Sequence, residues 1–367
     1  MLIHRLSRTA VCVLSLAAAA CGVTTDPDIA PDLDADAALE DYAAMEAILA
    51  SPDLEGFQAL GSRTPFGSAI AGADVVAGLS APSALDGGRS FARNLAGALV
   101  RHRSLSGAEP AAAPVISGIT RGKTFVYDPE VDDYRLAPDR EGAPENGVRF
   151  IMYEVDEAGV PILETEIGYA DLLDEGEGSA EDIVLRLLVV QRDETVLDYR
   201  TTLDVTDDGG ALTVQGFAVG DGARLDFDIA ASGREVPGGG ELLDLDFDLS
   251  VESRDFRILG AVTGIDEADD DVGRIDISVT HGSESVRLDI AGTEGELDGT
   301  VYVNGSVFAT VTGPEADPVF QDATGQPLTL RQLLVLRHAF EAFGNVLGFL
   351  EDLLDPVDEI VFLGIIL

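Results

Sequence analysis

The chain has no tryptophan, a single lysine at Lys123, and only two cysteines, Cys12 and Cys21. Both cysteines lie within the first 21 of the 367 residues, so the remaining chain cannot form an internal disulfide. Its stability must therefore come from an ordinary hydrophobic core, and the chain is long enough to build one or two. Basic residues are also scarce, at 23 against 67 acidic ones, which gives a net charge of −44. Such a surface repels phosphate backbones and excludes nucleic acid as a partner.

Motifs of catalysis are also missing. The sequence has no G-x-S-x-G elbow, no G-x-x-x-x-G-K-[ST] loop and no H-E-x-x-H helix, and its Gly-rich stretches lack the third glycine of a dinucleotide fingerprint. His102, His281 and His338 lie far apart in sequence, so we assign no metal to them. We therefore expect a non-enzymatic protein without a cofactor and assign no catalytic residue.

The N-terminus has the pattern of a secretory signal peptide over residues 1–20. Arg5 and Arg8 precede an apolar and small-residue stretch from Thr9 to Ala20. This stretch is too short to span a bilayer as a helix, which takes about 20 apolar residues. The pattern predicts an exported protein whose signal is removed.

The small-residue run that ends at Cys21 resembles the lipobox of bacterial lipoproteins, although Ala18 stands where that family prefers leucine. The resemblance implies that Cys21 becomes the first residue, carries a diacylglyceryl group and palmitate-type acyl chains, and anchors the protein to a membrane. Gly22, in place of aspartate, resembles the class sorted to the outer membrane. An alternative stays open, because Ala18 to Ala20 also form an A-x-A cleavage site that would leave Cys21 as a free thiol.

Four further segments follow the signal. Residues 21–35 are Pro- and Asp-rich and predict an acidic flexible tether. Residues 36–115 are rich in Ala and Gly and predict a partly helical region, with helices over 36–50 and 89–103. Residues 116–313 predict an antiparallel β-meander of about a dozen strands, and residues 314–367 predict a C-terminal helix with an apolar tail that packs on the sheet.

The meander is predicted from alternation with a period of two. In "LDLDFDLSV" the residues Leu243, Leu245, Phe247, Leu249 and Val251 share one face, and three aspartates share the other. The stretches "RLDFDIA", "RIDISV" and "VRLDIAG" repeat the pattern, and "VGDGAR" and "YVNGSV" are typical hairpin turns. Each strand is thus expected to have one dry face and one acidic, wet face.

A long helix is predicted from about Leu330 to Leu354. Thr329 and Gln332 have the spacing of a capping box, and apolar residues then recur at intervals of three and four. The expected fold class is mainly β (α+β), in which a curled antiparallel meander, a half-barrel or a barrel, packs against N-terminal helices and this C-terminal helix. That architecture resembles half-barrel lipoprotein and lipid carriers, although no motif carries the likeness.

Three stretches are candidate sites. Residues 142–178 are dense in aromatic, Gly and Pro residues, and Arg149, Tyr153 and Tyr169 lie there among acidic residues. We interpret this segment as two strands. It is also the first place to look for a polar site. The acidic runs 32–36 and 266–271 offer oxygen ligands for calcium but are interpreted as solvated segments.

These observations lead to one expected function and two alternatives. The expected function is a membrane-anchored envelope lipoprotein that binds a lipid or another amphiphile between its sheet and its helices. The first alternative is a structural or interaction lipoprotein with a filled core. The second is a secreted hydrolase that uses carboxylates, since 67 acidic residues offer many pairs.

Overall fold

The structure is a computed structural model. It describes residues 40–61 and 116–336, with gaps at 42, 46, 49, 117, 157, 177–181, 206–208, 237–239, 267–271, 294–295, 315–317, 330–331 and 334–335. Cys21, the tether, the helix predicted over 89–103 and most of the C-terminal helix lie outside these residues. No described helix is long and apolar enough to cross a membrane.

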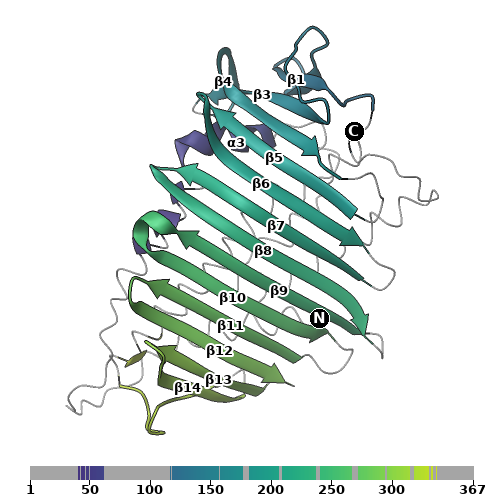
Figure 1. The fold of residues 1–367 in the computed structure, drawn as a ribbon. Coiled ribbons are helices and arrows are strands. Elements are labelled where there is room, and N and C mark those ends of the chain that lie inside the picture. The colour runs from purple at the N-terminus through teal and green to yellow at the C-terminus, as the bar shows by residue number, and fades with distance from the viewer. Residues whose placement is uncertain are drawn as a thin grey trace. The chain divides into compact units, whose positions relative to one another are not determined.

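The described chain is mainly β, as predicted, and forms a mixed sheet of 15 strands in the order β15 to β3, then β1, then β2 (Figure 1). The strands in chain order are β1 (Lys123–Asp128), β2 (Asp133–Leu136), β3 (Gly147–Val155), β4 (Pro161–Asp174), β5 (Asp182–Gln191), β6 (Glu194–Val205), β7 (Gly209–Gly220), β8 (Ala223–Val236), β9 (Gly240–Val251), β10 (Phe256–Asp266), β11 (Val272–His281), β12 (Glu284–Thr293), β13 (Glu296–Val303), β14 (Ser306–Pro314) and β15 (Val319–Asp322). Among the described residues the end strands β15 and β2 do not pair, so the sheet is not a closed barrel.

The strands belong to two compact units. The β1–β8 unit includes the strands up to Ala230, within β8, and the helix α3 (Pro52–Gly61). The β8–β15 unit continues from Ala231 and includes a short 3-10 helix, η3 (Glu252–Arg254), between β9 and β10.

The expected all-antiparallel meander is wrong at one pair of strands. β1 and β2 form an antiparallel hairpin, but β1 then pairs with β3 in parallel, with Phe125 opposite Phe150. Residues 137–146 connect β2 to β3 and include Pro138 and Pro144, which have no N–H to donate to a strand neighbour. This connection carries the chain back past β2, so that β3 lies beside β1 and the sheet is mixed.

The hairpin turns explain the short connections. Asp221 and Gly222 both have positive φ, at 50° and 73°, and Asn304 and Gly305 have 49° and 74°. Two consecutive residues with positive φ match the twist of antiparallel strands, which is why Asp-Gly and Asn-Gly are favoured there. The two turn predictions are confirmed.

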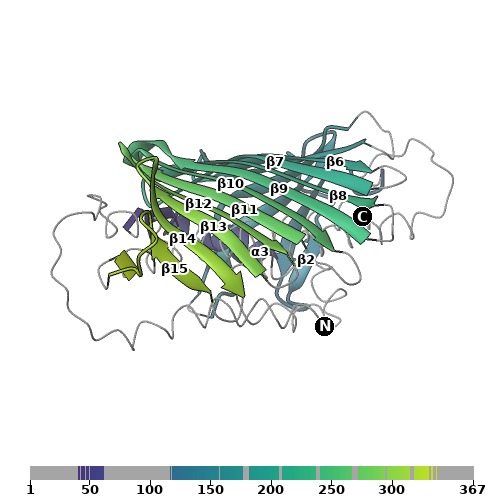
Figure 2. The ribbon, with the colours of Figure 1, turned by 90° about the horizontal axis from the view of Figure 1, so that it is seen from below.

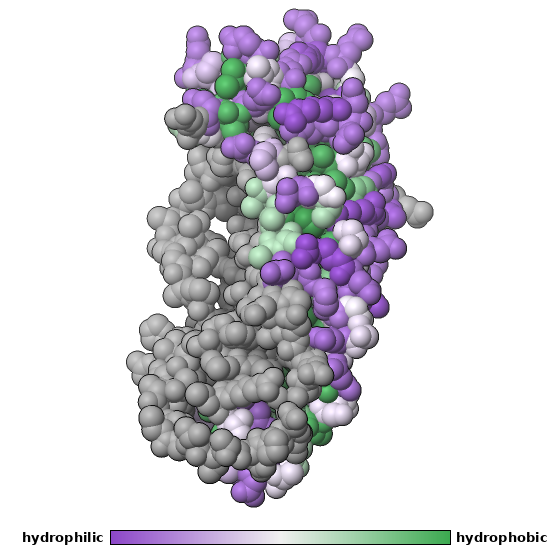
Figure 3. All heavy atoms as spheres, turned by 90° about the vertical axis from the view of Figure 1, so that its left-hand side faces the viewer, coloured by the Kyte–Doolittle hydropathy of each residue, from purple (hydrophilic) through white to green (hydrophobic). Residues whose placement is uncertain are grey.

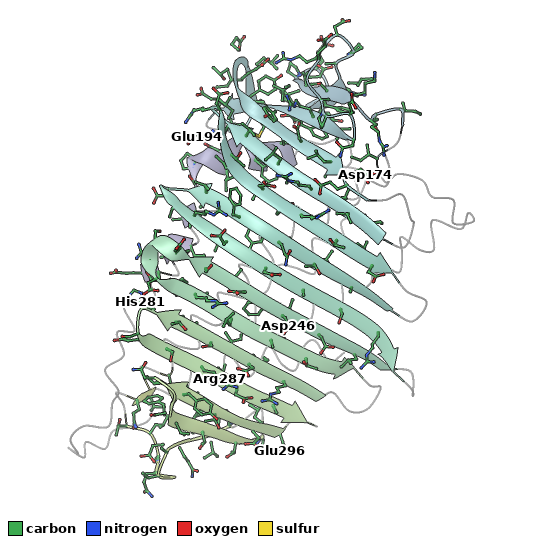
Figure 4. All side chains as sticks on the ribbon, viewed as in Figure 1. Asp174, Glu194, Asp246, His281, Arg287 and Glu296 are labelled. Atoms are coloured by element: carbon green, nitrogen blue, oxygen red, sulfur yellow. The ribbon has the colours of Figure 1, made fainter. Side chains whose placement is uncertain are left out.

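The predicted alternation is confirmed where it is strongest. In β9, Leu245, Phe247, Leu249 and Val251 are buried while Asp246 is exposed, and Asp246 lies on the face turned to the viewer in Figure 4. In β8, Leu225, Phe227 and Ile229 are buried. The pattern weakens in β11 and β12, where Ile275 and Ile290 are half-buried.

Helix α3 was not predicted, although its start carries recognisable signals. Ser51 precedes the helix, Pro52 is its first residue and Asp53 lies in its first turn. The Ser51 carbonyl accepts a hydrogen bond from Leu54 N at 2.8 Å, and its hydroxyl accepts one from Asp221 N at 3.2 Å. The helix contacts β3, β4 and β7 and lies against one face of these strands (Figure 2). The helix predicted over 36–50 is described only in part, and its described residues from 40 to 48 are helical.

The capping box predicted at the start of the C-terminal helix is confirmed. Thr329 N donates to Gln332 Oε1 at 2.8 Å, and Gln332 N donates to Thr329 Oγ1 at 3.3 Å. Leu336, which belongs to the predicted apolar stripe, is buried. The length of this helix and its packing on the sheet stay predictions, because the residues after 336 lie outside the described part.

Candidate functional site

The candidate binding surface is the apolar face of strands β5 to β8 in the β1–β8 unit, which we call the inner face. Its residues meet in rows across the strands: Leu187 lies opposite Tyr199 and Tyr199 opposite Gly216, and the next row joins Leu185, Thr201 and Val214. All of these except Gly216 are buried. The inner face consists of Ile183, Leu185, Leu187, Val189, Gln191, Leu197, Tyr199, Thr201, Leu203, Leu212, Val214, Gly216, Ala218, Leu225, Phe227 and Ile229.

Tyr199 is the largest polar side chain of the inner face. A Cβ at Gly216 would lie 2.3 Å from Tyr199 Cβ, so only glycine leaves room for Tyr199 at this register. The tyrosine ring lies near Phe227, with ring centroids 6.1 Å apart and planes tilted by 58°. Burial raises the pKa of the Tyr199 phenol above its ordinary value, because an ionised oxygen would lose its hydration.

Two buried polar atoms of the inner face have no hydrogen-bond partner in the described part of the chain. They are the Tyr199 hydroxyl and Gln191 Oε1. Apolar surface interrupted by a few polar atoms is the usual lining of a small-molecule pocket. The sequence places both residues on the dry face by alternation but contains no signal that their polar atoms would lack partners.

The segment 142–178 forms two strands, as interpreted from its sequence, and contains a polar cluster. Arg149 of β3 donates from Nε and Nη2 to the carboxylate of Asp171 on β4 at 2.7 and 2.6 Å. The guanidinium also lies 3.5 Å above the centre of the Tyr169 ring. The hydrogen bonds that Arg149 donates to the Asp171 carboxylate hold the pKa of Arg149 above its usual range. Because its charge is matched by buried Asp171, this arginine is poorly suited to bind a further anion.

Tyr153, the third aromatic or basic residue singled out in this segment, lies opposite Glu166 rather than in the Arg149 cluster. Glu166 in turn accepts hydrogen bonds from Arg140, one of them from Nη1 at 2.8 Å. Tyr153 is buried, and this burial raises the pKa of its phenol. The structure therefore brings Arg149 and Tyr169 together but separates Tyr153 from them.

His281 lies at the end of β11 (Figure 4) and is not isolated. Its Nδ1 contacts a carboxylate oxygen of Asp41, which is 1% exposed, and the other oxygen of Asp41 accepts a hydrogen bond from Arg254 Nε at 2.5 Å. Since Asp41 is separated from these partners by more than 200 residues in sequence, local pattern does not predict the cluster. A buried carboxylate against Nδ1 orients the imidazole, and the Arg254 guanidinium compensates the buried charge.

The opposite, wet face of the strands carries paired charges. In the β8–β15 unit, Arg257 donates two hydrogen bonds to Asp248, and Arg287 donates two to Asp276 on the neighbouring strand. These contacts are bidentate, because the planar guanidinium can donate two parallel hydrogen bonds to one carboxylate, which a lysine cannot do. Hydrophilic residues dominate the described surface visible in Figure 3. This face has the character of a solvated surface.

The other residues considered from sequence are not brought into a site. Cys21, His102, His338 and the acidic run 32–36 lie outside the described residues, as does all of the run 266–271 except Asp266. Within the described ranges no three His, Cys, Asp or Glu side chains form a group suited to a metal ion. Comparisons of the chain with protein-family models, curated proteins and solved structures gave no match in any of the three.

Proposed function

We propose that the chain is an exported envelope lipoprotein, anchored to the bacterial outer membrane through acylated Cys21, that binds a lipid or another amphiphile against its inner face. The proposal is carried by one observation: the inner face is broad and apolar, yet it contains two buried polar atoms without partners among the described residues. An amphiphile combines an apolar chain with a few hydrogen-bonding atoms and matches such a lining. The signal-like N-terminus supports the location.

Native mass spectrometry tests the bound ligand. Protein extracted from membranes of the producing cells in mild detergent is expected to carry an additional non-covalent mass, which disappears in a denaturing spectrum. Acyl chains on Cys21 remain in both spectra, because they are covalent. A native mass equal to the denatured mass, after extraction in several mild detergents, would contradict ligand binding.

The anchor gives a separate prediction. In Cys21→Ala we expect loss of labelling by an alkyne fatty acid and release of the protein from the membrane fraction, because one cysteine holds all the acyl chains. Cys12→Ala is the matched control and should leave labelling unchanged, because Cys12 lies within the signal. A wild-type protein without acyl mass would refute the anchor.

A second candidate, a structural or interaction lipoprotein with a filled core, is favoured by the packing of the β8–β15 unit. A Cβ at Gly260 would lie 2.0 Å from the ring of Phe247, and one at Gly299 would lie 2.6 Å from Ile290. Side chains of the adjacent strands thus fill the space that these two glycines leave, which is the close packing expected of a filled core.

One pair of variants distinguishes the candidates. If the inner face holds a ligand, Val214→Phe should fold, melt near the wild-type temperature and lose the additional native mass, because the phenyl ring takes the place of the ligand. If the face is already filled by the chain, the same change overpacks a core and should lower stability by about 1–3 kcal/mol. Thr213→Phe, one residue along on the opposite face, is the control. It should change neither the stability of the protein nor the additional native mass.

A further inference from the structure

The Tyr199 hydroxyl is a donor that lacks an acceptor. The residue is 4% exposed, its oxygen is buried, and it has no hydrogen-bond partner in the described part of the chain. More than nine in ten buried polar groups in proteins are hydrogen-bonded, because an unmet one loses its bond to water and gains nothing. A buried phenol that faces apolar neighbours therefore offers a hydrogen-bond donor that an acceptor from outside the chain could satisfy.

The surroundings of Tyr199 favour an apolar ligand with one polar atom. Leu187 and Gly216 flank it on the neighbouring strands, and Phe227 lies against its ring. Because Gly216 has no side chain, the tyrosine can lie over β7 and approach Phe227 on β8. The hydroxyl thus has apolar neighbours on both adjacent strands and on β8.

Charge decides which acceptor fits. Among the described residues, the inner face contains no basic side chain. The arginines of these strands are exposed or half-exposed and pair elsewhere: Arg186 with Asp198, Arg200 with Glu175 and Arg224 with Asp226. A carboxylate placed beside Tyr199 would be a buried charge without a counter-charge, which is strongly unfavourable. A neutral carbonyl oxygen accepts the same hydrogen bond without that cost.

We propose that the inner face binds a neutral acyl ester whose carbonyl oxygen accepts a hydrogen bond from the Tyr199 hydroxyl. This inference rests on the proposed function and narrows its ligand to esterified acyl chains, in preference to free fatty acids. The acyl chain lies along the apolar rows of β5 to β7, and the ester lies at Tyr199.

Three probes of similar length test the inference: methyl hexadecanoate, hexadecanoate and heptadecane. Their affinities are measured by displacement of a fluorescent dye from the purified mature protein. Tyr199→Phe removes only the hydroxyl, so it should lower the affinity for methyl hexadecanoate about 5- to 10-fold, the usual effect of one neutral hydrogen bond. Heptadecane should bind both proteins equally, and hexadecanoate should bind the wild type more weakly than the ester. Tyr302→Phe, on β13, is the matched control and should change none of the affinities.

Infrared spectroscopy supplies a readout that needs no variant. The carbonyl band of carbon-13-labelled methyl hexadecanoate should appear in wild-type protein at the lower frequency of a hydrogen-bonded ester. A band at the frequency of a free ester, equal ester affinity in Tyr199→Phe, or preference for hexadecanoate would each overturn the inference while the proposed function stands. If the wild type binds none of the three probes, the result would instead count against the proposed function itself.

Discussion

Leu245→Asp is expected to lower the free energy of unfolding by about 4 kcal/mol or more, whereas Asp246→Asn should change it by less than about 0.5 kcal/mol. Leu245 is 3% exposed and lies opposite Val262 on β10, so the substitution removes a packed side chain and buries a charge without a partner. Asp246, the next residue, is exposed on the other face. Chemical denaturation with urea, followed by circular dichroism, measures both values.

The two substitutions are at adjacent positions, and they alter opposite faces of β9. Leu245→Ala completes the series, because it removes the packed atoms without adding a charge and should lie between the two, at a cost of about 2–5 kcal/mol. Equal effects at positions 245 and 246 would mean that the two faces of β9 are not distinct, and would refute the assignment of dry and wet faces.

The sequence predicts those features of the fold that depend on neighbouring residues. The alternation of Leu245, Phe247 and Leu249 identifies a strand with a buried face, and Asn304-Gly305 identifies a hairpin turn elsewhere in the chain. Both signals are contained in a few residues. The capping box of Thr329 and Gln332 is equally local. Such features follow from backbone geometry and side-chain size alone.

Features that depend on distant residues could not be predicted in this way. The parallel pairing of β1 with β3 arises from the path of residues 137–146, and the contacts of Asp41 with Arg254 and His281 join segments more than 200 residues apart. Helix α3 is an intermediate case: Ser51 and Pro52 mark its start, but ten residues with an internal glycine give little periodic signal. The candidate site divides similarly, because alternation places Tyr199 on the dry face but only the packing leaves its hydroxyl without a described partner.

Gly216→Ala is expected to destabilise the protein by about 3 kcal/mol, a large effect for the addition of one methyl group. A Cβ at this position would lie 2.2 Å from the carbonyl oxygen of Asp198 and 2.3 Å from Tyr199 Cβ. The first contact is with backbone, which cannot rotate away, so β6 and β7 must separate or Tyr199 must leave its position beside Phe227. Thermal unfolding of the purified variant measures the loss.

Gly292→Ala is the matched control, because Gly292 also lies within a strand, β12, and a Cβ there would meet its nearest atom at 3.6 Å, an ordinary van der Waals distance. We expect its stability to be unchanged or slightly raised, since alanine restricts the unfolded chain more than glycine does. Equal stability of Gly216→Ala and Gly292→Ala would show that β6 and β7 do not approach as closely as the structure describes. If Gly216→Ala is destabilised and also binds methyl hexadecanoate more weakly than its residual folded fraction explains, the same close approach that fixes Tyr199 also positions its hydroxyl for the ligand.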